Sequence, residues 1–502
     1  MINKYGFYLS LDPLKKVRKM KKFLFALFLV ALIIIGLNFL NISIYDYIIQ
    51  DYSELAAEDY NGVDIDKVDN YMIDVEFNPV VKTCKVKQTI DYINKEERPL
   101  TELYFHIYPN AFRQNMQPWD PSSNINDSYE SGYIEFSSIK INGKEVKRKV
   151  LGSDQSLLII NLIEKLVPGR RIAIALDYTL KIPNINHRFG YTETTFNFGN
   201  WYPIAAVFDQ NGWNQSEYYQ IGDPFYSDVS NFNINITAPK EFIIAGSGKL
   251  ISEETLDSKK MWHFKANLMR DFAWVASDRF KYRTHNLKDN QIKMYFLTGN
   301  NNLMNYTEKI ATQAMQIFNK EFGHYPYGQI SLVETYFLSG GMEYPGLVYL
   351  GTDKFKSARK TFLSEYIVHE LAHQWWYAVV GNNQITEPWL DEGLATYSQI
   401  IFSQKARGEG YADGLYRSLM TNYNTYSSPI DLQTPVTDFE LWSDYSAVAY
   451  GKGAAFFHNI DQKYGKEDLN KILRTYYKKY RFKNATAQDL FKIYEEVLGV
   501  SY

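Results

Sequence analysis

The sequence predicts an α+β multidomain protein in which an apolar N-terminal segment precedes a β-rich domain and then a helix-rich domain. Three observations predict this order. Residues 23–40 carry no charge, residues 66–282 contain segments that alternate between apolar and polar side chains, and residues 283–502 contain segments with helical periodicity. A chain of 502 residues is long enough for two or three domains with sizeable cores.

Composition narrows the class of protein. Hydrophobic residues make up 45% and charged residues 22%, which is ordinary globular composition. The formal net charge of -3 shows no basic excess, so we expect no nucleic-acid partner. Cys84 is the single cysteine, which excludes an intramolecular disulfide and a cysteine-based structural metal site.

The uncharged segment 23–40 is long enough to cross a membrane. Six Lys and Arg residues precede it and five Asp and Glu residues follow it within residues 15–59. The positive-inside rule then predicts a single-pass cell-membrane protein with a cytoplasmic basic tail at 1–22 and the rest of the chain outside. A cleaved signal peptide is the alternative, but the segment is longer than usual for one and no A-x-A-like cleavage site follows it. A buried soluble helix fits the charge asymmetry less well.

The β-rich domain is predicted at 66–282, after a short acidic stalk at 41–65. Its strands alternate in polarity and are separated by turn signals such as Asn142-Gly143 and Pro168-Gly169. The predicted strands are 71–79, 84–93, 102–109, 157–162, 172–182, 231–239, 241–250 and 261–267.

The domain at 283–502 combines one predicted strand, 329–337, with several helices. The helix at 361–380 is expected to stop before Gly381-Asn382-Asn383, and Thr486 with Asp489 forms a capping-box pattern. The predicted helices are 305–322, 361–380, 389–404, 411–424, 447–464, 466–480 and 487–498.

His369-Glu370-Leu371-Ala372-His373 is an H-E-x-x-H pattern inside one of these helices. Residues four apart lie on one face of a helix, so both imidazoles can reach one metal ion. Glu370 lies one position round the helix and can reach a water bound to that metal. The alternative is a helix with two ordinary histidines and a solvated glutamate.

A catalytic zinc needs a third protein ligand and an open position for water. Eighteen residues separate His373 from Glu392, which lies on the following predicted helix. Two helices joined by a short connection pack antiparallel, which can bring Glu392 opposite the histidines. Glu392 alone would be read as a surface carboxylate, but the spacing favours a His2Glu metal site, a type that binds several divalent metals.

The pattern from His369 to Glu392 resembles that of the gluzincin zinc peptidases, and in particular the M1 aminopeptidase family. Residues 339–345, Ser-Gly-Gly-Met-Glu-Tyr-Pro, are similar to that family's G-x-M-E-N motif. Residues 450–454, Tyr-Gly-Lys-Gly-Ala, resemble its Y-x-K-G segment. The resemblance covers about residues 68–500 and implies a β-saddle domain followed by a thermolysin-like zinc peptidase domain.

This resemblance implies zinc-dependent hydrolysis of peptide bonds, most simply the release of N-terminal amino acids from peptide substrates. Zn²⁺ held by His369, His373 and Glu392 would lower the pKa of its bound water. Glu370 would act as the general base, and Tyr450 would stabilise the oxyanion together with zinc.

The resemblance also assigns residues that bind the substrate. Glu343 matches the glutamate that holds the free α-amine, and Tyr445 matches a second tyrosine of some members. The backbone of Gly340, Gly341 and Met342 would pair with the peptide as an added strand, with the two glycines allowing close approach or positive φ.

Three departures from the family pattern affect these expectations. Tyr344 replaces the motif's final Asn, which is expected to alter one wall of the specificity pocket. In the β domain, residues 199–203 stand where many members carry a further polar amine anchor. Asn200 could still accept a hydrogen bond there, but Tyr202 replaces an acid, so a weaker amine anchor is expected. Only 52 residues follow Tyr450, so a large C-terminal helical domain is expected to be absent and the cleft more open.

Three rival functions remain open. An anchored partner of a membrane transporter is one of them, and a single spanning helix neither supports nor excludes it. The two others keep the peptidase fold. One is a zinc endopeptidase with an open cleft, which dependence on a free amine would separate from an aminopeptidase. The other is a non-catalytic surface protein that keeps the fold for binding. The intact set of metal ligands, base and tyrosine argues against the second.

Overall fold

The computed structural model describes residues 54–56, 59–113, 129–357, 360–425 and 429–500. The chain divides into two compact units, 1–52 and 53–502, and all described residues belong to the second. No helix among the described residues is long and apolar enough to cross a membrane. The predicted cytoplasmic tail at 1–22 and anchor at 23–40 lie outside the described residues.

The described end of the predicted stalk packs against the folded unit. Leu55 forms an antiparallel bridge with Tyr327, and the Ala56 N–H donates to the Pro326 carbonyl at 2.6 Å. The Asn61 side chain donates to the Lys479 carbonyl at 2.7 Å. The described residues at the end of the predicted stalk 41–65 therefore contact later parts of the chain.

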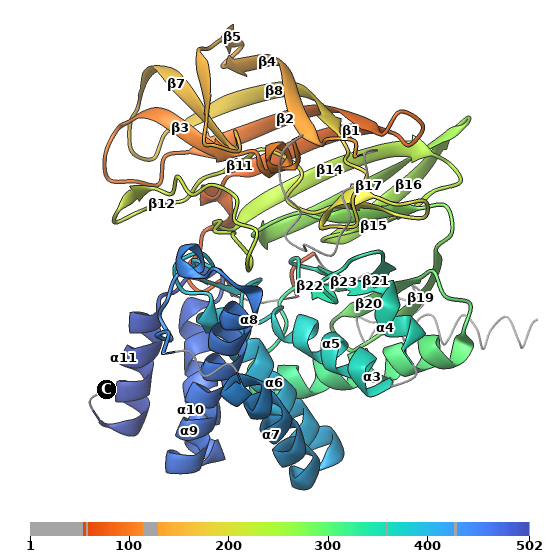
Figure 1. Ribbon diagram of the computed structural model, residues 1–502. Coiled ribbons are helices and arrows are strands. Elements are labelled where there is room, and N and C mark those ends of the chain that lie inside the picture. Colours follow the sequence, from red (N-terminus) through yellow and green to blue (C-terminus); the bar gives the residue numbers. More distant parts are fainter. Residues whose placement is uncertain (1–53, 57–58, 114–128, 358–359, 426–428, 501–502) are drawn as a thin grey trace, which may run out of the picture. The chain divides into compact units, whose positions relative to one another are not determined.

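The first part of unit 53–502 is built from β-sheets, as the alternating sequence predicted (Figure 1). One sheet has eight strands in the order β16-β17-β14-β1-β2-β8-β4-β5. Two four-stranded sheets have the orders β15-β18-β10-β9 and β11-β3-β7-β6, and β12 pairs with β13. The bounds are β1 Asn70–Asn78, β2 Thr83–Ile93, β3 Leu100–His106, β4 Tyr133–Ile141, β5 Lys144–Glu145, β6 Arg148–Leu151, β7 Leu157–Leu166, β8 Arg171–Lys181, β9 Phe189–Tyr191, β10 Phe196–Phe198, β11 Ile204–Ala205, β12 Phe208–Asp209, β13 Gly212–Trp213, β14 Ser230–Pro239, β15 Ile243–Gly246, β16 Lys249–Leu256, β17 Lys259–Met269 and β18 Trp274–Ser277.

Alternation explains why these strands form a sheet with one buried face. In β1 every second side chain is buried, namely Tyr71, Ile73, Val75 and Phe77, and the residues between them are polar or more exposed. Successive side chains of a strand point to opposite faces, so this pattern places one face of β1 on the core.

The second part begins with a five-stranded sheet of order β19-β20-β21-β23-β22. Strands β20, β21 and β23 run parallel, and β22 is an antiparallel edge strand. Helices α3 and α5 pack against each other and against strands of this sheet, α3 on β20 and α5 on β22 and β23 (Figure 1). The bounds are β19 Lys281–Asn286, β20 Gln291–Phe296, α3 Asn301–Glu321, β21 Gln329–Thr335, β22 Gly341–Met342, β23 Leu347–Gly351, α4 Thr352–Lys356 and α5 Lys360–Ala372. The change of sheet falls between Ser277 and Lys281, a few residues before the boundary expected at 282.

Helices make up most of the remaining chain. Their bounds are α6 Trp389–Arg407, α7 Glu409–Thr425, α8 Trp442–Tyr445, α9 Gly453–Tyr464, α10 Lys466–Tyr480 and α11 Ala487–Leu498, with the π-helix η4 at Ser446–Lys452 and the 3-10 turns η1 Ile65–Lys67, η2 Tyr108–Phe112 and η3 Val436–Asp438. A short parallel pair joins β24 Val380–Gly381 to β25 Lys483–Asn484. The predicted capping box of Thr486 and Asp489 is present at α11.

One helix prediction was wrong in extent, because the helix expected at 361–380 ends at Ala372. The helix expected at 447–464 is present, with its first part formed by the π-helix η4 and the rest by α9. Beyond Ala372 the side chains bond to other elements: Gln374 accepts from the Gly346 N–H at 2.9 Å, and the Trp376 indole donates to Ser398 at 3.1 Å. Tertiary contacts therefore override the helical periodicity of the sequence.

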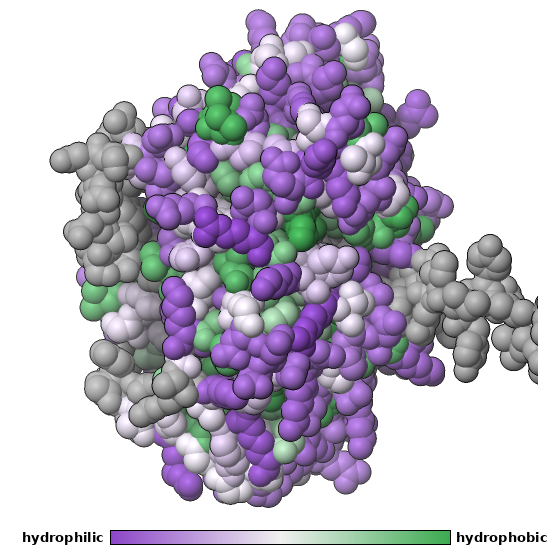
Figure 2. Space-filling model, turned by 90° about the vertical axis from the view of Figure 1, so that its right-hand side faces the viewer, coloured by the Kyte–Doolittle hydropathy of each residue, from purple (hydrophilic) through white to green (hydrophobic). Residues whose placement is uncertain are grey.

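The face of the molecule shown in Figure 2 is mostly hydrophilic, with apolar side chains in small patches near its mid-height. The largest fully buried side chains are aromatic and include six tryptophans. Many of the aromatic residues within the described part of the chain therefore lie in the hydrophobic core.

Candidate functional site

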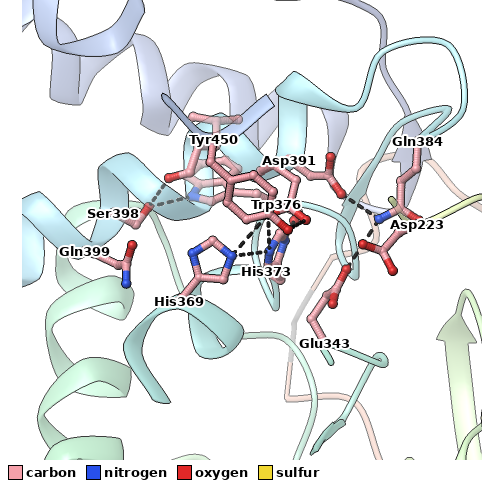
Figure 3. A network of polar contacts seen from close by, with 12 residues as sticks. Asp223, Glu343, His369, His373, Trp376, Gln384, Asp391, Ser398, Gln399 and Tyr450 are labelled. Carbon is pink, nitrogen blue, oxygen red and sulfur yellow. Dashed lines mark hydrogen bonds and ion pairs between the residues drawn. The ribbon is translucent and has the colours of Figure 1, made fainter. Parts of the chain in front are cut away.

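Three side chains converge at one point. His369 and His373, which Figure 3 labels, come from α5 and the turn that follows it. Glu392 comes from the first turn of α6. The Nε2 atoms of the two histidines are 3.2 Å apart, and they lie 3.1 and 3.3 Å from Oε2 of Glu392. The structure thus brings together the three ligands that the sequence predicted.

These distances fit a small divalent metal. Two ligand atoms at ~2.0–2.1 Å from a tetrahedral zinc are separated by about 3.3 Å, close to the spacings seen here. His373 Nδ1 lies 3.1 Å from the Trp376 carbonyl, to which it can only donate, so its Nε2 is left free for a metal. Gln399 from α6 is a hydrogen-bond partner of His369.

The charges of Glu392 and His373 favour the binding of a cation at these three side chains. Burial raises the pKa of Glu392, but His373 and His369 outweigh burial and lower it to about 2. Burial lowers the pKa of His373, whereas Glu343 and Glu392 raise it well above its ordinary value. Glu392 is therefore ionised at neutral pH. Glu343 and Glu392 favour the protonated form of His373, and a bound metal ion would take the place of that proton.

Glu370 lies beside the ligand set and packs on the edge strand β22. A Cβ added to Gly341 would lie 2.1 Å from Oε1 of Glu370, and one added to Gly340 would lie 2.3 Å from Cε1 of Tyr366. Gly340 has a positive φ of +95°, which favours glycine, and the absence of a side chain at Gly341 lets the Glu370 carboxylate lie against the backbone. Burial raises the pKa of Glu370 to about 8, and a cation at the nearby ligands would favour its ionised form.

Tyr450 lies in the π-helix η4, and its side chain contacts His369 and Glu392. Its hydroxyl donates to Oε1 of Glu392 at 2.6 Å, and its ring stacks on His369 with a centroid distance of 5.6 Å. A π-helical turn of this kind is frequent at functional sites. Tyr445, also predicted as a site residue, packs in a small buried cluster that includes Phe439, and its ring centroid lies 5.9 Å from that of Tyr450.

A cavity of about 370 Å³ opens onto these groups. The predicted residues that line it are Gly341, Met342, Glu343, His369, Glu370, His373, Glu392 and Tyr450. Gly340 and Tyr445 were also predicted as substrate-binding residues but are not among the residues that line it.

One end of the cavity carries a pair of buried carboxylates. One carboxylate oxygen of Asp223, one of Glu343 and one of Glu392 all lie within 4.8 Å of one another. Arg188 Nη1 bonds Asp223 Oδ1 at 2.8 Å, and the Gln384 side chain donates to Glu343 at 3.4 Å. Burial raises the pKa of Glu343 well above its usual range, and Asp223 raises it further. A ligand cation placed here would relieve the repulsion between the two acids.

Two expectations for this end were wrong. Tyr344 does not form a wall of the cavity, and Asn200 does not reach it. The Tyr344 hydroxyl donates to Oδ1 of Asn200 at 2.9 Å, and Asn200 Nδ2 donates to Asp271 at 2.7 Å. Gly199 makes room for this contact, because a Cβ there would lie 1.8 Å from the Tyr344 hydroxyl. The two departures from the family pattern thus bond to each other behind the site.

Arg188 and Asp223 were missed by the sequence analysis. Arg188 precedes β9, and Asp223 lies in the segment between β13 and β14, far in sequence from the zinc-ligand helices. Neither residue belongs to a periodic pattern or a motif, so only the folded chain places them beside Glu343.

A family model described as "Peptidase family M1 domain" matches residues 306–501. "Aminopeptidase 2" of Candida albicans is 28% identical over 296 residues, which cover 54% of this chain and 31% of that protein. "Endoplasmic reticulum aminopeptidase 2" of Homo sapiens is 24% identical over 368 residues, which cover 70% of this chain and 38% of that protein. The chain therefore spans only about a third of the length of these curated relatives.

Solved structures share the fold over a larger fraction of the chain. The M1 zinc metallopeptidase from Deinococcus radiodurans aligns with a TM-score of 0.61 and 17% identity, covering 86% of this chain and 91% of that one. A mutant of that protein bound to a Tyr-Ser-Ala substrate aligns with the same score, identity and coverage. The multidomain α+β architecture expected from the sequence is confirmed by this likeness.

Proposed function

Since residues 306–501 of this chain form a peptidase family M1 domain, we propose that the protein is a zinc-dependent aminopeptidase that releases N-terminal amino acids from peptides. Curated relatives that match the chain are named as aminopeptidases. The His2Glu set also has the ligand types and spacing that zinc takes in catalytic sites.

The observation that carries the proposal is the pair of buried acids, Asp223 and Glu343, beside the ligand set. A protonated α-amine would bond to both carboxylates and neutralise part of their charge. Holding the amine there fixes the first peptide bond of the substrate at the metal, which limits cleavage to one residue from the N-terminus. Arg188 keeps Asp223 in place through its 2.8 Å contact.

Zinc bound by His369, His373 and Glu392 would polarise the scissile carbonyl and acidify a water molecule. Glu370 then takes a proton from the attacking water and delivers it to the leaving amine. Its contact with Gly341 holds its carboxylate next to the edge of β22. This edge is the unpaired end of the described five-stranded sheet, so a peptide can add to it as a strand.

Tyr450 is suited to stabilise the oxyanion that develops on the carbonyl. Its hydroxyl lies within hydrogen-bond distance of a metal ligand, and its ring is fixed against His369. A donor held in place in this way needs no reorganisation when the charge forms.

The test is hydrolysis of a panel of aminoacyl-coumarins by the full chain, each with a free and an acetylated N-terminus, with and without a zinc chelator. We expect cleavage of the free-amine substrates alone, loss on chelation and recovery with added Zn²⁺. A Glu370→Gln variant that still binds zinc but does not cleave is the matched control.

Other results would favour the rivals. Cleavage of acetylated or internally positioned bonds would indicate an endopeptidase with an open cleft. Zinc binding without hydrolysis of any substrate would indicate a binding protein that keeps the fold.

We also propose that residues 23–40 anchor the protein in the cell membrane, with the N-terminus cytoplasmic and the catalytic domain outside. The support is the uncharged length of this segment and the basic residues before it. Membrane fractions should retain the full chain after carbonate extraction, and externally added protease should degrade the catalytic domain on intact cells. Release by carbonate, or protection from protease, would overturn this topology.

A further inference from the structure

The cavity has a second end, on the opposite side of the metal ligands from Asp223 and Glu343. Phe362, Glu365 and Tyr366 line it from α5, one to two turns before His369. Gln399 lines it from α6. Figure 3 shows Gln399 beyond His369, whereas Asp223 and Glu343 lie on the far side of His373.

The contacts of the edge strand β22 define which way a substrate runs between the two ends. Glu343 follows the strand, Gly341 packs against Glu370, and Gly340 packs against Tyr366. A peptide whose amine is held at Glu343 reaches Glu370 only by running antiparallel to β22. At about 3.3 Å per residue, the residue after the cleaved bond then lies beside Gly340 and Tyr366.

Glu365 gives this end a negative charge. Its side chain is half-buried, and no ion pair with it is found among the described residues. Two cations lie in this region, and neither forms an ion pair with Glu365 among the described residues. Arg407 donates to Ser364 at 2.7 Å and stacks on Tyr411, whereas Lys354 pairs with Asp353 at 2.7 Å.

Charge and shape together match a long cationic side chain. Burial raises the pKa of Glu365, whereas Arg407 lowers it, so a cation brought to this carboxylate would favour its ionised form. The exposed ring of Phe362 offers apolar surface to the methylene stem of lysine or arginine, whereas one face of the Tyr366 ring carries Lys354 Nζ at 4.4 Å from its centroid.

We propose that this end of the cavity is a subsite for the residue that follows the cleaved bond, and that Glu365 selects lysine or arginine there. The inference rests on the proposed aminopeptidase function, since the direction of the substrate follows from the amine held at Glu343.

The experiment uses the full chain and the tripeptides Ala-X-Ala, with X as lysine, norleucine or glutamate. Norleucine keeps the stem of lysine without its charge. We expect kcat/KM for lysine to exceed that for norleucine by about fivefold, the scale of a partly exposed ion pair, and glutamate to be the poorest. Glu365→Gln should remove the preference for lysine, and Glu365→Lys should reverse the order in favour of glutamate.

Controls separate this subsite from the catalytic machinery. Glu254→Gln, an exposed carboxylate on β16, should leave the tripeptide order unchanged. Alanyl-coumarin has no cationic group after the cleaved bond, so its hydrolysis by the unmodified protein reports aminopeptidase activity independently of any preference for lysine. Zinc content and Tm of each variant show whether it is folded and loaded.

The outcomes distinguish the two proposals. If alanyl-coumarin is cleaved but lysine and norleucine are equivalent, or if the lysine preference survives in Glu365→Gln, the inference is overturned and the proposed function stands. If neither the coumarin nor any tripeptide is cleaved by the zinc-loaded protein, the proposed function fails and the subsite fails with it.

Discussion

Gly341 and Glu370 are in direct contact, although they belong to a sheet edge and to a helix. A Cβ added to Gly341 would lie 2.1 Å from Oε1 and 2.4 Å from Cδ of Glu370. The strand that is proposed to hold the peptide backbone thus also sets the position of the proposed base. Binding geometry and proton transfer are coupled through this one contact.

Gly341→Ala should therefore displace the Glu370 carboxylate. We expect kcat to fall by at least about tenfold, because a shift of about 1 Å in a catalytic group costs up to 10²-fold. Bound zinc should be unchanged, since the metal ligands are not touched. Gly410→Ala is the control, because a Cβ at this helical position meets nothing within 4 Å. Equal kcat for both variants would contradict the role of the contact.

Glu370→Gln keeps the shape of the side chain and removes the base. We expect kcat to fall by about 10²–10⁴-fold, the contribution typical of general acid–base catalysis. KM should change little, and metal analysis should still find one zinc per chain. A variant that keeps more than half of the original kcat would assign the base to another residue.

Tyr450→Phe removes the hydroxyl that donates to Glu392 and leaves the ring stacked on His369. We expect a loss of about 10²–10³-fold in kcat with little change in KM, as for removal of one oxyanion donor. Tyr445→Phe is the comparison, because Tyr445 packs in a buried cluster and does not line the cavity. Similar losses in kcat for both variants would argue against a special role of Tyr450.

Asp223→Asn should weaken recognition of the free amine. We expect kcat/KM for free-amine substrates to fall by about tenfold or more, the size of a charge-assisted hydrogen bond. Glu343→Gln should act in the same way, and the double variant should lose less than the product of the two, because both acids serve one group. Independent, multiplicative losses would show that the two acids bind different parts of the substrate.

Asp223→Asn should also lower Tm, because it leaves the buried Arg188 guanidinium without its charged partner at 2.8 Å. A scanning measurement of thermal unfolding separates this loss of stability from the change in substrate recognition.

The metal ligands and the base could be predicted from the sequence because their geometry is local or nearly so. His369 and His373 are four residues apart, and Glu392 lies on the next helix after a short connection. The same local pattern overestimated the helix, which ends at Ala372 because Gln374 and Trp376 bond to other elements.

The amine-binding end could not be predicted in the same way. Asp223 and Arg188 come from irregular segments of the β-rich part, and nothing local marks their position. The resemblance to the family pattern pointed instead to Asn200, whose side chain accepts a hydrogen bond from Tyr344 and donates one to Asp271. Long-range packing of loops decides such positions, and residue spacing does not encode it.

Asp271 makes the stability of the protein depend on pH. It is buried and accepts hydrogen bonds from Asn200 Nδ2 and the Phe272 N–H, both at 2.7 Å. Burial raises its pKa from 3.8 to about 7, although the Phe272 N–H acts in the opposite direction. Between these two values the folded protein holds a proton that the unfolded chain has lost. Raising the pH through this window therefore lowers the free energy of unfolding, by at most ~1.4 kcal/mol per pH unit for one group.

Asp271→Asn removes this titration and keeps an acceptor oxygen. Urea unfolding of both proteins at pH 5, 6 and 7 should show the variant gaining stability relative to the unmodified protein as the pH rises. The absolute order at pH 5 depends on how well the amide fits, but the pH dependence of the difference does not. A difference that stays constant over this range, or that falls with pH, would mean that Asp271 is ionised in the folded protein and that Asn200 and Phe272 stabilise its charge.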